Sequence, residues 1–134
     1  MNIGRFILST IAAYVAFAVL FTVAMTFVFP GAMIAFADLM RPQDDPMMMW
    51  AYLGHMVQTI VLVWFFEKGF GTKDLMKGAV FGGMFGIYVA ASSFVMYMSF
   101  KWPTEYMVTQ LITDVVIFAL VGVVLALLHK PQEA

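Results

Sequence analysis

The sequence predicts an all-α integral membrane protein, a single domain in which four membrane-spanning helices form a bundle with short connections. Three observations support this fold class. Of the 134 residues, 63% are hydrophobic and only 11% are charged, whereas soluble domains average about 25% charged residues. Four apolar segments reach the length of about 20 residues that a helix needs to cross a bilayer. Proline or glycine stands at the junctions between these segments, as expected of helix breakers.

The four expected spans are residues 7–29, 47–66, 75–100 and 104–128. The first ends at Pro30 and Gly31, and it is longer than the roughly 7–15 residues of a signal-peptide core, so we expect a retained helix. Pro46 precedes the second span and Pro103 precedes the fourth. The loop after the first span contains the sequence GAMIAFADLM, for which we expect a short helix lying at the membrane surface.

The distribution of lysine and arginine predicts the orientation. With the N-terminus inside, the cytoplasmic side holds Arg5, Lys68, Lys73, Lys77 and Lys130, and the outer side holds Arg41 and Lys101. This bias follows the positive-inside rule, so we expect both termini in the cytoplasm. The net charge of −1 gives no indication of nucleic-acid binding, and without cysteine there is no disulfide or thiol chemistry.

The third span contains glycines that a helix in water would tolerate poorly, at a cost of roughly 1 kcal/mol each. Its small residues are spaced by four and so share one face: Gly78, Gly82, Gly86 and Ala90. In a membrane such a glycine zipper lets a second helix approach closely. The fourth span offers a complementary face of Ala119, Gly122 and Ala126. The partner of the stripe is either a helix of the same chain, or a second copy or another subunit, or a lipid or pigment tail.

Polar side chains occur at similar depths in three of the spans. His55 and Asp114 are the ionisable members, and membrane-embedded ionisable groups indicate a functional site by default. If the polar faces turn inward, they form one polar centre of His55, Gln58, Ser93, Tyr97, Gln110 and Asp114. A His55–Asp114 pair would either fix helix register, carry protons or a cation, or bind a ligand. The end of the fourth span, FALVGVVLALL, is apolar, which counts against a continuous path across the membrane.

No pattern of catalytic residues, metal ligands or cofactor ligands is present, so we expect no enzymatic activity, no metal and no cofactor. A haem held by two histidines would need a second histidine at the depth of His55, and His129 lies at the end of a span. The 13 methionines carry thioether sulfurs, which are soft ligands that Cu(I) prefers. Methionine also fills gaps between apolar helices, so its number alone does not indicate a copper site.

Three segments carry a resemblance to known proteins: MMWAYLGHMVQTIVLVWFF, KGAVFGGMFGIYVAASSFVMYM and TDVVIFALVGVVLALL. Together they resemble a group of small bacterial four-helix membrane proteins of unknown function. The resemblance covers about three quarters of the chain and implies four spans and a bacterial inner membrane, without implying an activity. Small multidrug transporters have a similar length and number of spans, but their first helix carries a glutamate, and the first span here contains no acidic residue.

These observations favour a non-enzymatic accessory or scaffolding subunit that assembles through glycine and small-residue faces. Its expected partners are the lipid bilayer and other membrane subunits or further copies of itself. The alternative is a small oligomeric transporter or channel that uses the polar centre around His55 and Asp114.

Overall fold

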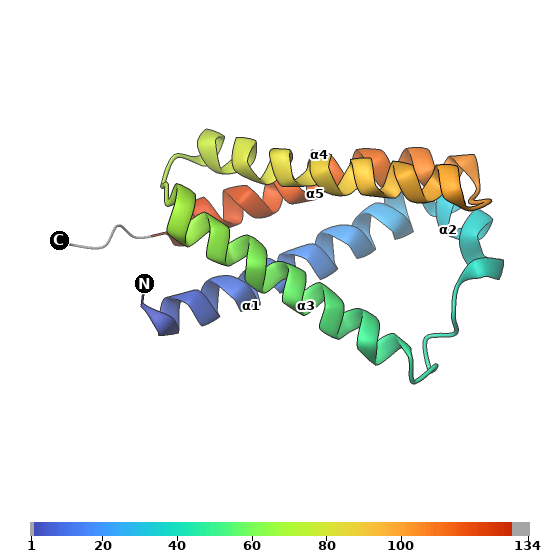
Figure 1. Cartoon of the computed structure of the whole chain (residues 1–134), viewed down its shortest axis with the longest axis horizontal. Coiled ribbons are helices and arrows are strands. Elements are labelled where there is room, and N and C mark those ends of the chain that lie inside the picture. The colour runs from blue at the N-terminus through green and yellow to red at the C-terminus, as the bar shows by residue number, and fades with distance from the viewer. Residues whose placement is uncertain (1, 130–134) are drawn as a thin grey trace.

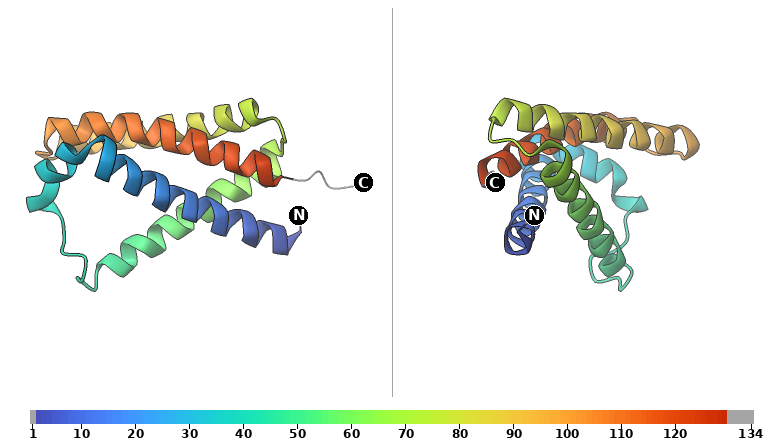
Figure 2. Two further views of the ribbon diagram at one scale, coloured as in Figure 1. Left: turned by 180° about the vertical axis from the view of Figure 1, so that it is seen from behind. Right: turned by 60° about the vertical axis from the view of Figure 1, so that its left-hand side comes forward.

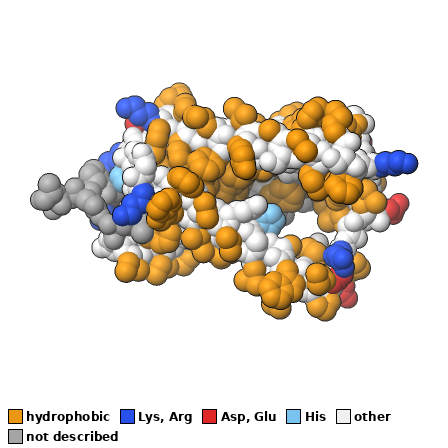
Figure 3. Space-filling view, viewed as in Figure 1, with side chains coloured by type: hydrophobic (Ala, Val, Ile, Leu, Met, Phe, Trp, Pro, Cys, Tyr) orange, Lys and Arg blue, Asp and Glu red, His pale blue; other side chains and the backbone are white. Residues whose placement is uncertain are grey.

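The computed structural model describes residues 2–129, and within this range every regular element is a helix. Four helical segments are long and apolar enough to cross a membrane: Ile3–Val28, Met48–Phe70, Leu75–Ser99 and Thr104–Leu128. Charged side chains gather at the two ends of the face shown in Figure 3, with hydrophobic side chains between them. The all-helical fold class with four candidate spans is therefore confirmed.

In chain order the elements are α1 (Ile3–Val23), η1 (Ala24–Val28), α2 (Pro30–Phe36), η2 (Ala37–Leu39), α3 (Met48–Phe65), η3 (Phe66–Phe70), α4 (Leu75–Ser99) and α5 (Thr104–Leu128). The first helix begins earlier than expected because the side chain of Asn2 caps it, accepting a hydrogen bond from the Arg5 N–H at 3.3 Å. The second span continues through the π-helical turn η3 and stops at Gly71. This residue has a φ of 40°, in the left-handed region that glycine adopts most easily.

Helices α4 and α5 form an antiparallel hairpin that packs along its whole length (Figure 1). The glycine stripe of α4 faces α5, and all four of its residues are buried. A Cβ on Gly78 would lie 2.5 Å from the carbonyl oxygen of Gly122, and one on Gly86 would lie 2.6 Å from that of Asp114. The stripe therefore serves the protein's own fold, and its small-residue partner on α5 is the predicted one.

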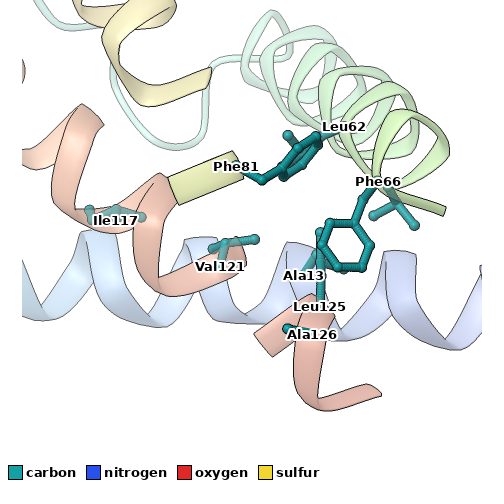
Figure 4. Close-up of a cluster of buried hydrophobic side chains, with 9 residues drawn as sticks. Ala13, Leu62, Phe66, Phe81, Ile117, Val121, Leu125 and Ala126 are labelled. Atoms are coloured by element: carbon teal, nitrogen blue, oxygen red, sulfur yellow. The ribbon is translucent and has the colours of Figure 1, made fainter. Parts of the chain in front are cut away.

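Helices α1 and α3 cross each other on one side of this hairpin (Figures 1 and 2). Phe17 of α1 meets Phe118 of α5 edge to face, with ring centroids 4.7 Å apart. Ala13 of α1 and Phe66, the first residue of η3, are completely buried in the hydrophobic core (Figure 4). We call the end of the molecule with Asn2, His129 and the α3–α4 turn the termini end, and the opposite end the loop end.

The outer half of α3, residues 48–58, differs from the compact bundle that short connections predict. It diverges from α4 toward the loop end, so that α3 and α4 open like a V (Figure 1), while the Tyr52 carbonyl still accepts a hydrogen bond from Tyr14 of α1. At the closed end of the V, aromatic rings lie between the two helices. The ring centroids of Phe66 and Phe81 are 5.2 Å apart, and those of Phe65 and Phe85 are 5.9 Å apart. These rings hold α3 away from α4, whereas glycine allows α5 to approach α4 closely.

The loop end contains the short helix expected in the first connection, formed by α2 and the 3-10 turn η2. Its Phe36 stacks on Tyr106 of α5 with ring centroids 4.0 Å apart, and Trp102 meets both rings edge to face. The helix in this loop is confirmed, while its position at the membrane surface stays a prediction.

Candidate functional site

Asp114 lies at the centre of a polar cluster between α4 and α5. Its Oδ2 accepts a hydrogen bond from the Ser93 hydroxyl at 3.0 Å, and its Oδ1 accepts one from the side-chain amide of Gln110 at 2.7 Å. Only 7% of Asp114 is exposed. The cluster therefore ties the two helices together through a buried carboxylate with both oxygens occupied.

Helical spacing positions these groups. Gln110 and Asp114 are four residues apart and share one face of α5, and Ser93 continues the side of α4 on which Gly86 and Ala90 lie against α5. Thr109 and Thr113 are buried on the same helix, and the Thr113 hydroxyl donates to the Thr109 carbonyl at 2.9 Å. The Thr113 hydroxyl thus bonds to its own helix, and Asp114 interacts with Gln110 and Ser93.

One polar atom of this cluster has no partner within the described part of the chain. The side-chain carbonyl oxygen of Gln110 is buried and accepts no hydrogen bond there. A buried acceptor without a donor is costly, at about 1–3 kcal/mol. Beside the Asp114 carboxylate, this oxygen can receive one further hydrogen-bond donor.

His55 and Gln58 do not join this cluster. They lie on the part of α3 that has left the bundle, and both are exposed. Their side chains bond to each other, with 3.1 Å between Nδ1 of His55 and Oε1 of Gln58. Because an amide oxygen only accepts, Nδ1 is the donor, and Nε2 of His55 stays available as an acceptor.

The predicted single polar centre is therefore divided into three parts. Ser93, Gln110 and Asp114 come together as expected, His55 pairs with Gln58 instead of Asp114, and Tyr97 bonds to Thr104 at 2.9 Å near the loop end. The physical reason is the direction of α3, which carries its polar face away from α5.

Sequence analysis missed Tyr88, which lies near the middle of α4. It is 72% exposed, and its hydroxyl has no hydrogen-bond partner within residues 2–129. One turn away, the Ser92 hydroxyl donates to the backbone carbonyl of Tyr88 at 3.2 Å, which leaves the Ser92 oxygen able to accept. In the sequence, the spacing of four between Tyr88 and Ser92 indicates that the two share a face of α4, and this face differs from that of the glycine stripe.

A second missed contact closes the termini end. Nδ1 of His129 lies 3.2 Å from Oε2 of Glu67, and both side chains are largely buried. The His129 ring also meets Phe66 edge to face, with centroids 5.9 Å apart. This contact fastens the end of α5 to the turn that follows α3, and the only sequence signal was that both residues end a span.

The described residues contain no group of three or more His, Cys, Asp or Glu side chains that could hold a metal ion. The six residues of the predicted polar centre supply hydrogen-bonding and acid–base groups: one carboxylate, one imidazole, two amides and two hydroxyls. They can bind a polar group, exchange a proton or join helices.

Comparison with family models, curated proteins and solved structures found no match for this chain.

Proposed function

We propose that this chain is a non-enzymatic accessory or scaffolding subunit of a membrane assembly. The observation that supports this most directly is the outer half of α3. It belongs to a segment long enough to span a membrane, yet it exposes His55 and Gln58 well inside that segment. Polar side chains at such depth are expensive in lipid and usually face protein or water.

The rest of the fold supports an assembly role for this arm. The glycine stripe is covered by α5, so its close packing holds a stable internal hairpin. Docking to other proteins then uses the surfaces that the hairpin leaves uncovered. These are the V between α3 and α4, and an open apolar groove of about 670 Å³ between α1 and α5, lined by Ala12, Ala16 and Val124 among others.

The proposed location is a bacterial inner membrane with both termini in the cytoplasm. Four of the five residues expected inside, Arg5, Lys68, Lys73 and Lys77, lie at the termini end of the described chain, and Lys130 lies outside the described residues. The orientation is tested on this cysteine-free chain with a membrane-impermeant maleimide, which should label a K73C variant only after the membrane is opened, and a Q43C variant in intact cells.

The assembly role is tested by removing the polar groups of the arm. A chain with His55→Leu and Gln58→Leu should leave its native particle, because these side chains lose the hydrogen bonds that a partner supplies. Val57→Leu, an exposed apolar change on the same part of α3, is the matched control. Particle size after mild detergent extraction measures the effect, and a double variant that keeps the wild-type particle would contradict the proposal.

A second candidate function is a small oligomeric transporter, and the unpaired Gln110 oxygen beside Asp114 favours it. A transported proton or cationic group would find both an acceptor and a carboxylate there. Asp114→Asn separates the two functions, since a transporter would lose pH-dependent flux while it still assembles. A scaffold has no flux to lose, and its particle should keep its composition.

A further inference from the structure

Helical periodicity directs two polar walls toward the V between α3 and α4. On α3 the wall is the His55–Gln58 pair, and on α4 it is Tyr88 with Ser92. Both walls lie on the sides of their helices that touch at the closed end of the V. His55 stands seven residues before Leu62, which lies beside Phe81 in the hydrophobic core (Figure 4), and Gln58 stands seven residues before Phe65, which meets Phe85. Tyr88 and Ser92 stand seven residues after Phe81 and Phe85. Seven residues are two helical turns, so each polar residue repeats the face of its contact residue.

The two walls also match in position along their own helices. His55 and Ser92 each lie about 10 Å along the helix axis from the loop end of their helix, at ~1.5 Å per residue. Gln58 and Tyr88 lie about 15–16 Å from it on the same measure. The antiparallel register that brings Phe66 to Phe81 would therefore place Gln58 opposite Tyr88, and His55 opposite Ser92.

The chemistry of the walls is complementary. Tyr88 has a free hydroxyl that can donate to Nε2 of His55, and it can accept from the side-chain amide of Gln58. Ser92 has an oxygen that can accept from the same amide. Within one chain these groups do not meet, because α3 has left α4 and its backbone is held toward α1, where the Tyr14 hydroxyl donates to the Tyr52 carbonyl at 3.4 Å.

The His55–Gln58 bond and the Ser92 bond to the Tyr88 carbonyl form within one chain. A lipid chain in the V would still leave the Tyr88 hydroxyl, the Gln58 side-chain N–H groups and Nε2 of His55 without partners, at a cost of several kcal/mol for each such group. A second copy of the chain supplies the missing partners. When the twofold axis of a dimer lies along the membrane normal, each residue of one copy stays at the depth of the same residue in the other. An α3 arm of the second copy that lies along α4 in the Phe66–Phe81 register brings its His55 and Gln58 beside Tyr88 and Ser92.

We propose that two copies exchange their α3 arms, so that the outer half of α3 from each copy enters the V of the other. His55 and Gln58 of each copy bond to Tyr88 and Ser92 of its partner copy. The contact is the same in both directions and closes as a dimer. This dimer rests on the proposed role of the arm as a docking element and names its occupant.

Disulfide cross-linking tests this directly, because the natural chain contains no cysteine. A Q58C chain and a Y88C chain with different affinity tags are expressed together and oxidised with copper phenanthroline in native membranes. The expected product is a disulfide-linked pair that carries both tags. The matched control is M76C, since Met76 is also on α4 and is 72% exposed like Tyr88, but it lies near the termini end. Q58C with M76C should give less than about a tenth of that product.

Equal cross-linking of Q58C to Y88C and to M76C, or none to either, would overturn the arm exchange. So would a Q58C/Y88C double variant, diluted with cysteine-free chain, that forms its disulfide within one molecule, because α3 would then close on its own α4. The fate of the proposed function is separate. A stoichiometric complex with other subunits but no cross-link refutes only the exchange, whereas a cross-linked dimer without other subunits refutes only the accessory role.

Discussion

Gly82 occupies the closest approach of α4 and α5. A Cβ built at this position would collide with the backbone carbonyl oxygen of Phe118, and backbone cannot move aside as a flexible side chain does. We therefore expect Gly82→Ala to destabilise the hairpin by about 1–3 kcal/mol, the usual range for overpacking. The free energy of unfolding in a detergent titration measures this loss.

Gly54 provides the control for that experiment. It is also a glycine within a candidate span, but a Cβ there would meet nothing within 4 Å. Gly54→Ala should leave the protein as stable as the wild type or slightly more stable, because alanine favours the helix. Equal losses from the two changes would show that the glycine stripe does not set the distance between α4 and α5.

Two substitutions at Asp114 test whether the structure needs its negative charge or only its hydrogen bonds. In Asp114→Asn, the amide oxygen can still accept from Gln110 and the amide nitrogen can donate to the Ser93 oxygen, so stability should change little. Asp114→Leu leaves both partners without a bond, and we expect a loss of about 1–3 kcal/mol. Thermal unfolding of the purified variants measures both, and a loss from Asn as large as that from Leu would contradict this view.

At the same scale, the sequence predicts contacts within one helix or one hairpin well. The spacing of four identified Gly78, Gly82 and Gly86 as a close-packing face, and the shared level of Ser93 and Asp114 brought these two together. It could not predict that His55 would lie apart from Asp114, because this depends on where a whole helix points.

Among the elements, α3 shows the limit of span prediction. Its length, its apolar character and its position after Pro46 are clear from the sequence, but hydrophobic patterns do not determine crossing angles. The angle follows from what packs at the closed end, where Phe66 and Phe81 meet. Rings on one side of α4 and glycines on the other give an open V and a tight hairpin in the same molecule.

The turn that leads into α3 gives a prediction for an element outside the spans. The Met47 N–H donates to the Asp45 carboxylate at 2.8 Å, and Arg41 pairs with it at 2.9 Å. Both contacts lower the pKa of Asp45 below its ordinary value of 3.8, and the hydrogen bond from Met47 has the larger effect. The turn should therefore stay intact at neutral pH and lose these contacts only as the pH falls through that lowered pKa.

This prediction is tested by following the Asp45 carboxyl with NMR during an acid titration. In Arg41→Ala its pKa should rise only part of the way to the ordinary value, because the bond from Met47 remains. A complete return to the ordinary value would mean that Arg41 alone holds the turn.

For the whole molecule, the four helices leave much apolar and some polar surface uncovered. In the span that includes α1, only 11% of the most apolar stretch is buried within the chain. In the span formed by α5, the buried share of the corresponding stretch is 39%. Lipid can cover the apolar part, but the polar residues on α3 and α4 need hydrogen-bonding partners. The fold class and the number of candidate spans could be predicted from composition and segment length, whereas the assembly could not, because the partner surface is not part of one chain's sequence pattern.

The central claim, that this chain works as a subunit of a larger membrane assembly, is tested most directly by the mass and composition of its native particle. The chain is extracted from its own membrane in a mild detergent, and the particle is analysed by native mass spectrometry. We predict a particle that contains two copies of this chain together with other membrane subunits in fixed proportion. A particle made of this chain alone would contradict the accessory role, and the flux assay at Asp114 would then decide whether the protein is a transporter.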